Sequence, residues 1–193
     1  DVDGDTVPNE AEDYLLADEL YLFHANSPCY ILSTTHSGTG LDPIAAPARS
    51  WNCAPGSYVA GEVISMTAIP DANWHIANWS GTTNNSSTEM VNYVVMPASN
   101  HVVHVTYMPS CYTLARSHTG SGNDPVAAPT KSALCGANGQ YVVGEPITVT
   151  ASAAPGWRVS SWSGTVNDAS TAAANSLVMP ASNHAVQITY LPK

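Results

Sequence analysis

The sequence predicts an all-β protein built from two tandem copies of one small domain, and three observations predict it. Residues 29–110 and 111–193 align along their whole length, so the chain carries an internal duplication. Within each copy, β-branched and aromatic residues alternate with a period of two, which is typical of half-buried strands. Gly and Pro are frequent, with 13 and 14 residues, and only 10% of residues are charged, against about 25% in an average soluble domain.

Each copy is expected to contain four or five short strands, because its alternating runs are bounded by clusters of Gly, Pro and Asn. In the first copy the predicted strands cover residues 29–36, 62–69, 74–79, 91–96 and 101–107. Their counterparts follow in the second copy, which has one additional residue in the loop near Asn138 and Gly139. No long helical pattern occurs after Pro28.

The duplication divides the chain into an N-terminal segment, residues 1–28, a first repeat, residues 29–110, and a second repeat, residues 111–193. The net charge is −10, and eight of the fifteen carboxylates lie in the first nineteen residues. The chain begins at Asp1, without a Met or a leader pattern, so we expect a processed product or a piece of a longer protein.

Charge and hydropathy exclude two classes of function. Binding to nucleic acid requires clustered Lys and Arg that neutralise phosphates, and the chain has only five such residues. No window approaches the roughly 18 consecutive apolar residues of a membrane-spanning helix. We therefore expect no nucleic-acid partner and no membrane span.

Four cysteines occur at matching positions, two in each copy. If each copy folds by itself, the duplication selects the disulfides Cys29–Cys53 and Cys111–Cys135 among the three connectivities. The alternative, a metal site, needs close C-x-x-C pairs with supporting His ligands, and the sequence has neither. Two disulfides indicate an oxidising compartment, so we expect a secreted or cell-surface protein.

The first twelve residues place oxygen donors at the spacing of a calcium loop, in which alternate side chains converge on the ion. The candidate Ca²⁺ ligands are Asp1, Asp3, Asp5, the carbonyl of Val7, Asn9 and Glu12. This stretch resembles the D-x-D-G-D-G-x-P-D-x-x-E motif of thrombospondin type 3-like repeats, from which it departs at Thr6 and Asn9. The alternative interpretation is a solvated acidic tail or the start of a linker.

The acidic loop is followed by an apolar stretch that ends in a candidate assembly segment. Residues 10–22 are compatible with a short amphipathic helix, and the last apolar residues equally fit a strand. The candidate assembly segment consists of Leu20, Tyr21, Leu22 and Phe23. Its partner would be the first repeat or a neighbouring molecule, reached by strand addition.

Three motifs recur in the body of the repeats: Y-x-x-G-E-x-I-x-x-T-A, W-x-x-x-x-W-S-G-T and V-M-P-A-S-N-H. With these motifs, the chain from Cys29 to Lys193 resembles divergent bacterial relatives of the internalin B-repeat, found in tandem in large surface and secreted proteins. In the first copy the motif residues are Tyr58, Gly61, Glu62, Trp74, Trp79, Gly81, Met96, Pro97, Asn100 and Tyr107. The resemblance implies small β-grasp-like or sandwich modules that act as spacers or adhesive units, with no known chemistry.

The tryptophans divide into core and surface candidates. Trp74 and Trp79 lie five residues apart and would face opposite sides of a regular strand, so one is expected in the core and the other is a candidate for the sheet surface. Packing in the core is the favoured interpretation for both, and an exposed glycan-binding platform is the alternative. Trp51 is matched by Ala133 in the second copy, so we expect it to be an exposed surface aromatic.

Two histidines invite a catalytic interpretation that the sequence does not support. His36 and His118 precede Gly-rich turns, with Asp42 and Asp124 six residues later. No nucleophile elbow accompanies them, as a Ser-His-Asp site would require. We interpret these stretches as turns in which Asp precedes Pro.

The favoured function is an extracellular structural or adhesive repeat protein, a subunit of a cell-surface stalk, adhesin or filament. The alternative is a carbohydrate- or surface-binding accessory module of a larger secreted enzyme. An enzyme is not expected, because neither copy has paired carboxylates, a metal cluster or an activated nucleophile. The expected partners are copies of itself, neighbouring repeats of a longer chain, or glycans.

Overall fold

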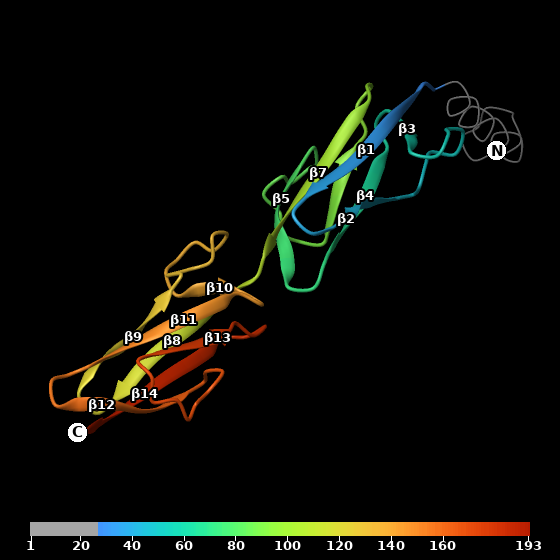
Figure 1. Cartoon of the computed structure of the whole chain (residues 1–193). Helices are drawn as coiled ribbons and strands as arrows, with labels where there is room; N and C mark the ends of the chain where they lie inside the picture. Colours follow the sequence, from blue (N-terminus) through green and yellow to red (C-terminus); the bar gives the residue numbers. More distant parts are fainter. Residues whose placement is uncertain (1–26) are drawn as a thin grey trace, which may run out of the picture. The chain divides into compact units, whose positions relative to one another are not determined.

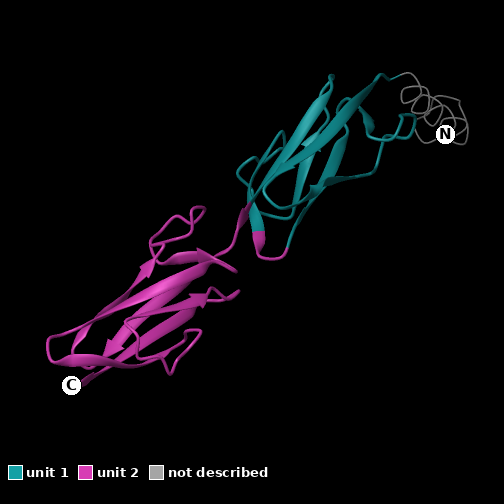
Figure 2. Cartoon of the chain, in the orientation of Figure 1, with its two compact units in different colours: residues 1–71, 75–107 teal, residues 72–74, 108–193 magenta. Residues whose placement is uncertain are grey.

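The computed structural model describes residues 27–193, and all its regular elements are β-strands (Figure 1). The all-β prediction is therefore confirmed. Contacts divide the chain into two compact units, coloured in Figure 2. Of the described residues, the first unit contains 27–71 and His75–Tyr107, and the second contains Ala72–Trp74 and Met108–Lys193. No helix that could cross a membrane occurs in residues 27–193.

The first unit has a four-stranded and a three-stranded sheet. The four-stranded sheet has the order β3–β1–β7–β5, in which β1 runs parallel to β7 and antiparallel to β3. The three-stranded sheet has the order β2–β4–β6 and is antiparallel throughout. The strands are β1 (Cys29–Ser37), β2 (Gly40–Ala46), β3 (Ser57–Val59), β4 (Val63–Pro70), β5 (Trp74–Ser80), β6 (Val91–Val95) and β7 (His101–Pro109).

The second unit repeats this topology, with the orders β10–β8–β14–β12 and β9–β11–β13. Its strand β8 runs parallel to β14, as β1 does to β7. The strands are β8 (Cys111–Thr119), β9 (Gly122–Ala128), β10 (Gln140–Val142), β11 (Pro146–Ala153), β12 (Trp157–Ser163), β13 (Ala174–Val178) and β14 (His184–Pro192).

Each unit is a β-sandwich, because alternate residues of both sheets meet in one core. On β14, Val186, Ile188 and Tyr190 are buried while the residues between them are more exposed. They pack in one cluster with Ile147 of β11 and Leu177 of β13, which belong to the other sheet. Of the two architectures that the resemblance implies, the structure is the sandwich.

The tryptophan pair shows where regular-strand geometry fails. Trp162 is buried and Trp157 is half-buried against the same core cluster, although the two are five residues apart. The register between β12 and β14 shifts between Val159 and Ser161, which marks a β-bulge. A bulge adds one residue to a strand and so reverses the alternation beyond it. The favoured expectation of core packing is therefore confirmed for Trp157 and Trp162, and the alternation argument that placed one of them at the sheet surface is wrong.

Two predicted turns are strands. The predicted turn at Asp42 lies in β2, and the predicted turn at Asp124 lies in β9. A proline in a strand cannot donate to the ladder, so it is confined to an edge, and both β2 and β9 are edge strands. The short strands β3 and β10 were also absent from the predicted set, which makes seven strands per unit.

Candidate functional site

Two sets of predicted residues lie outside the described part of the chain. They are the calcium ligands Asp1, Asp3, Asp5, Val7, Asn9 and Glu12, and the assembly segment Leu20, Tyr21, Leu22 and Phe23. Within residues 27–193, no three or more His, Cys, Asp or Glu side chains are grouped so that they could hold a metal ion. The calcium loop remains a prediction.

Both disulfides link the start of a long strand to the loop that follows the second strand. Cys29 at the start of β1 is bonded to Cys53, and Cys111 at the start of β8 is bonded to Cys135. Cys53 and Cys135 are each only 3% exposed. The described residues contain no free cysteine. The disulfides therefore anchor equivalent loops at equivalent ends of the two units.

The same loops are held by a buried hydroxyl network. Ser50 is 5% exposed, hydrogen bonds to the carboxylate of Glu62 and accepts a bond from the amide of Val59. Tyr58 donates to the carbonyl of Pro47 at 2.8 Å. Burial raises the pKa of the Tyr58 phenol, and the nearby charge of Glu62 raises that pKa further.

The second unit repeats this network. Ser132 lies 3.1 Å from Glu145, and Tyr141 donates to the carbonyl of Pro129 at 2.7 Å. Burial raises the pKa of Tyr141, an effect that the charge of Arg116 opposes. The Ser and Glu side chains thus stabilise a loop, and no histidine is hydrogen bonded to either serine among the described residues.

The His–Asp pairs form at equivalent places. Nδ1 of His36 lies 2.5 Å from Oδ1 of Asp42, and His118 and Asp124 are 2.5 Å apart in the second unit. The His36 ring also lies 5.9 Å from the ring of Tyr107. In the described residues no serine, threonine or cysteine is hydrogen bonded to His36 or His118. Each pair therefore joins the first two strands of a unit and does not form a catalytic triad.

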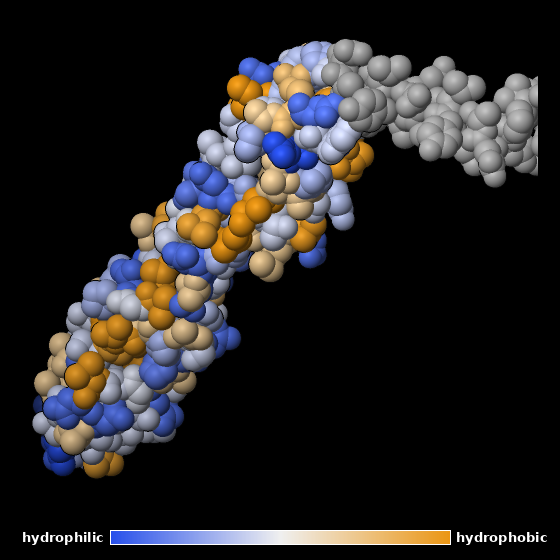
Figure 3. All heavy atoms as spheres, turned by 90° about the vertical axis from the view of Figure 1, so that its right-hand side faces the viewer, coloured by the Kyte–Doolittle hydropathy of each residue, from blue (hydrophilic) through white to orange (hydrophobic). Residues whose placement is uncertain are grey.

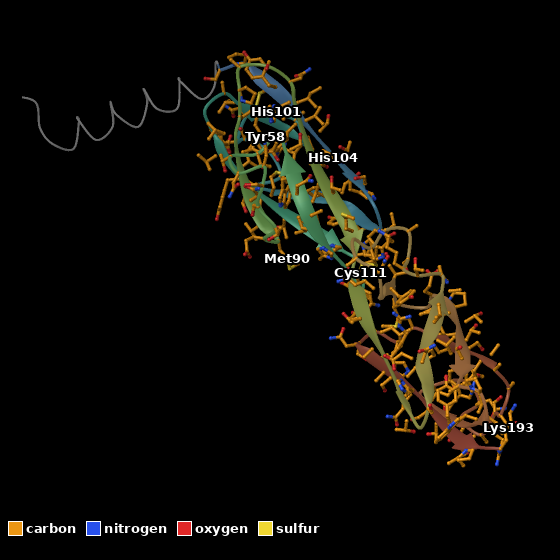
Figure 4. All side chains as sticks on the ribbon, turned by 90° about the vertical axis from the view of Figure 1, so that its left-hand side faces the viewer. Tyr58, Met90, His101, His104, Cys111 and Lys193 are labelled. Carbon is orange, nitrogen blue, oxygen red and sulfur yellow. A yellow bond between two sulfur atoms is a disulfide. The ribbon has the colours of Figure 1, made fainter. Side chains whose placement is uncertain are left out.

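A second histidine of the first unit lies on the exposed face of the four-stranded sheet. His104 on β7 faces Thr35 on β1, and Nδ1 of the ring is 2.9 Å from the Thr35 hydroxyl. The other ring nitrogen is 3.2 Å from the hydroxyl of Ser37. Figure 4 labels His104, His101 and Tyr58 on the first unit. The second unit has Gln187 in place of His104, so this cluster is not repeated.

An open depression recurs in both units beside the turn that follows β5 or β12. In the second unit it measures about 310 Å³ and is bordered by Gly164, Pro180 and His184, and in the first unit about 280 Å³ beside Gly81 and His101. The histidine ring closes the turn, with its Nε2 2.7 Å from the Gly81 carbonyl and 2.8 Å from that of Gly164. No Asp, Glu, Lys or Arg lines the depression in either unit, and its repetition follows from the shared turn.

The exposed tryptophan is where the sequence predicted it. Trp51 lies in the disulfide-linked loop and is 63% exposed. Position 133 of the equivalent loop is Ala. Trp51 therefore presents an aromatic surface in the first unit only.

Three of the four edge strands of the first sandwich, β3, β5 and β6, hydrogen bond to its own loops, and the fourth, β2, carries a proline. The loop after β5 hydrogen bonds to both edge strands on its side, through the amide of Trp79 to Asn85 and the amide of Thr83 to Tyr93. On the other side, the amide of Ser50 bonds to Ser57 of β3. Pro43 interrupts the donors of β2. Loops and prolines at sheet edges hinder the addition of a further strand.

The broad faces, in contrast, carry exposed apolar side chains. On the outer side of the sheet β2–β4–β6, the exposed large apolar residues include Ile44, Val63, Val91, Tyr93 and Val95, and these five residues we call the apolar face. Sequence reasoning predicted the strands at 62–69 and 91–96 but did not identify this face. A comparison of outward positions between the two copies would have found it, because the copies differ there.

The comparisons with known proteins decide the family. A family model described as a divergent InlB B-repeat domain matches residues 48–111 and residues 126–193. The chain belongs to this family. The predicted resemblance to B-repeats is thereby confirmed, and the first match falls largely in the first unit and the second match wholly in the second unit. No curated protein and no solved structure matches the chain.

The family and the disulfides agree on the broad class. The family match suggests an extracellular repeat module, and structural disulfides persist in oxidising compartments. The matched B-repeats begin after β2 and within β9, so β1 and the cysteine at its start lie outside the first match. The disulfide of the first unit therefore joins a matched to an unmatched part of the chain.

Proposed function

We propose that the chain is a non-catalytic structural repeat protein, a subunit of a cell-surface stalk, adhesin or filament. The observation that carries this proposal is that both units use their buried polar groups for the same structural tasks. In each unit a disulfide, a Ser–Glu pair and a Tyr–carbonyl bond hold one loop against the sandwich. A module that is repeated with its anchoring intact suits a load-bearing or spacing role.

The absence of enzymatic activity is part of the proposal. A hydrolytic site needs a nucleophile, a base within hydrogen-bond reach and a group that orients the base. The His36–Asp42 pair supplies only a base and its orienting group. The Ser50–Glu62 pair lies in a buried network, with its hydroxyl oxygen already bonded to an amide.

The experiment is to locate the protein in its native setting. Antibodies against the folded chain, applied to unpermeabilised cells and viewed by electron microscopy, should label surface appendages or the surface itself. Non-reducing and reducing gels of the same material should differ in mobility, because the two disulfides compact the unfolded chain. A chain found reduced inside cells, or only as freely released monomers, would contradict the proposal.

Calcium binding belongs to the same proposal as an ordering element. The supporting feature is the spacing of Asp1, Asp3, Asp5 and Glu12 in the sequence. Calorimetric titration of the whole chain with Ca²⁺ should give one site, and Asp3→Asn with Asp5→Asn should abolish the heat. No heat from the unaltered chain would remove calcium from the proposal.

Trp51 favours a second candidate function, a carbohydrate-binding accessory module. Exposed aromatic rings stack on sugar faces, and Trp51 is the most exposed aromatic residue among the large exposed apolar residues of the described chain. Affinity electrophoresis in gels that contain polysaccharides should show retardation that Trp51→Ala abolishes. Leu134→Ala, at an exposed position of the equivalent loop in the second unit, serves as the control. Equal mobility in all gels would leave the structural function alone.

A further inference from the structure

The apolar face of the first unit is continuous across three strands. Between β4 and β6, Val63 pairs with Val95, Ser65 with Tyr93 and Thr67 with Val91. On the other edge of β4, Thr67 pairs with Ile44 of β2. The five apolar side chains are between 44% and 60% exposed. Their outward neighbours Ser65 and Thr67 are uncharged. Figure 3 looks from the side on which β2 and β4 lie in Figure 1, and apolar residues gather there on the first unit.

The second unit provides an internal comparison, because it has the same fold and a different surface. The equivalents of Val91 and Tyr93 are Ala174 and Ser176, at matching register positions. Pro146 replaces Val63 and Val126 replaces Ile44, while Val178 is identical to Val95. The sandwich therefore folds without a large side chain at two of the five positions.

The additional apolar side chains call for a contact partner. Exposed apolar residues that stand singly are ordinary, whereas a contiguous patch marks an interaction site. Because the two units share a fold, packing within the sandwich does not explain Val91 and Tyr93. We take this difference as the sign of a contact that only the first unit makes.

The candidate assembly segment Leu20, Tyr21, Leu22 and Phe23 is such a feature, because it precedes the first unit only. The second unit is preceded by the end of the first unit, with no apolar segment of its own. We propose that this segment packs against the apolar face of the first unit of the same chain. The partner is thus a four-residue apolar stretch that replaces water over Val63, Tyr93 and their neighbours.

The connection between segment and face is short enough. Phe23 is six residues from Cys29, and six residues extend over about 20 Å at most. The two sheets of a sandwich are separated by about 10 Å. Cys29, at the start of β1, pairs with Val59 of β3. Strand β4 begins at Val63, four residues after Val59. The chain therefore enters the first unit at the end where Val63 and Val95 pair.

Packing on the face, and not strand addition, fits the hydrogen bonds at three of the four sheet edges, and at the fourth edge Pro43 removes a donor from β2. The edge strands β5 and β6 bond to the loop between them, and the edge of β3 bonds to Ser50. These backbone groups are not available to a further strand. Side chains on the outer face of β4 and β6 are available. The proposed contact is therefore side-chain packing, where the sequence had led us to expect strand addition.

A spin label tests the contact in the whole chain. All four cysteines are in disulfides, so Asp18→Cys adds a single reactive thiol outside the apolar segment. A nitroxide at position 18 should broaden the methyl signals of Val63, Val91 and Val95 and leave those of Val126 and Val178 sharp. Equal signals in all five valines would overturn the proposal.

Mixing distinguishes packing within one chain from packing between chains. Spin-labelled chains without isotope are mixed with isotope-labelled chains without nitroxide. No broadening in the mixture supports the intramolecular contact. Broadening of Val91 and Val95 in the mixture would overturn it in favour of a contact between two copies.

Proteolysis provides an independent readout with a matched control. Val91→Ala with Tyr93→Ser converts the face to the residues of the second unit, and so is expected to fold. Chymotryptic cleavage within residues 20–23 should become roughly tenfold faster, because the segment loses apolar contacts. Val126→Ala with Val178→Ala, on the equivalent face of the second unit, should leave the rate unchanged. Equal rates for both variants and the unaltered chain would overturn the proposal.

Discussion

The phenol of Tyr58 donates a hydrogen bond of 2.8 Å to the carbonyl of Pro47. This bond joins strand β3 to the loop that the Cys29–Cys53 disulfide also anchors. Tyr141 and Pro129 repeat it in the second unit at 2.7 Å. Covalent and hydrogen-bonded anchors thus act on the same loop, and each can be removed separately.

Removing the phenol hydroxyl should destabilise each unit. Tyr58→Phe or Tyr141→Phe leaves a carbonyl without its donor, so the free energy of unfolding of the affected unit should fall by about 1–2 kcal/mol. Guanidinium denaturation followed by far-ultraviolet circular dichroism measures the change. Tyr93→Phe, at a half-exposed position, is the control and should unfold like the unaltered chain. A midpoint unaffected by Tyr58→Phe and Tyr141→Phe would contradict the anchoring role.

The same tyrosines predict a loss of stability at alkaline pH. Burial is the largest cause that raises the pKa values of Tyr58, Tyr107 and Tyr141 in the folded chain. The folded state therefore holds these protons more tightly than the unfolded state, whose tyrosines ionise near pH 10. Stability should be constant below that pH and fall as the pH rises through the folded pKa values.

Thermal unfolding between pH 8 and 11 measures this decline. Phenylalanine cannot ionise, so Tyr58→Phe should be less stable at pH 8 and should lose less of its stability on going to pH 11. If the alkaline decline were as steep in that variant and in Tyr141→Phe as in the unaltered chain, buried tyrosines would not be its source.

The sequence was sufficient for those features that depend on local patterns and repetition. Strands such as β1 and β7 follow from period-two alternation, and the disulfide partners follow from the duplication. The features it did not reveal depend on tertiary context. Asp42 and Pro43 have the composition of a turn, yet the chain there lies along an edge where β4 supplies the pairing.

The tryptophans illustrate a second limit. Trp157 and Trp162 face one core because a bulge reverses the alternation between them, and no residue type marks that bulge. The apolar face was missed for a related reason. Val91, Tyr93 and Val95 alternate with buried residues, and alternation alone does not tell which side of a strand packs inward when both sides are apolar.

Loss of one disulfide should destabilise its own unit. Cys29 and Cys53 are 24 residues apart, and closing a loop of that size restricts the unfolded chain by about 3 kcal/mol. Cys29→Ala with Cys53→Ala should lower the denaturation midpoint of the first unit, while Cys111→Ala with Cys135→Ala should act on the second. Tryptophan fluorescence and circular dichroism record both transitions. Identical curves for the oxidised and reduced chain would refute a stabilising role.

Asp168 should make the second unit sensitive to acid. Its carboxylate accepts bonds from the amide and hydroxyl of Thr165, each at 2.8 Å, and these bonds lower its pKa. A lowered folded pKa means that the stabilisation is present above the unfolded value, near pH 4, and is lost as the pH falls through the folded pKa.

The first unit supplies the control for this prediction. Asn85 accepts the equivalent bonds from Thr82 without a titratable group. Asp168→Asn should therefore fold at neutral pH and remove part of the acid dependence between pH 5 and 2, measured by thermal unfolding. If Asp168→Asn retained the full acid dependence, that dependence would have to come from other carboxylates.

Two glycines with nearly the same backbone angle should respond very differently to alanine. Gly164 has φ of 77°, and a Cβ there would lie 2.1 Å from the carbonyl oxygen of Ala185. Gly144 has φ of 81°, and a Cβ there would meet no atom within 4 Å. Both substitutions carry the left-handed backbone cost of about 1–2 kcal/mol. Only Gly164→Ala adds a clash with backbone on the neighbouring strand.

Gly144→Ala should thus lower the free energy of unfolding by about 1–2 kcal/mol, and Gly164→Ala by distinctly more, on the order of 3 kcal/mol or above. Gly164→Ala should also displace the ring of His184, whose Nε2 lies 2.8 Å from the Gly164 carbonyl. Guanidinium denaturation compares the two stabilities, and the His184 imidazole signals in nuclear magnetic resonance report the displacement. Equal destabilisation by the two alanines would mean that β14 can move away from the turn, and the close approach at Gly164 would then not be required by the fold.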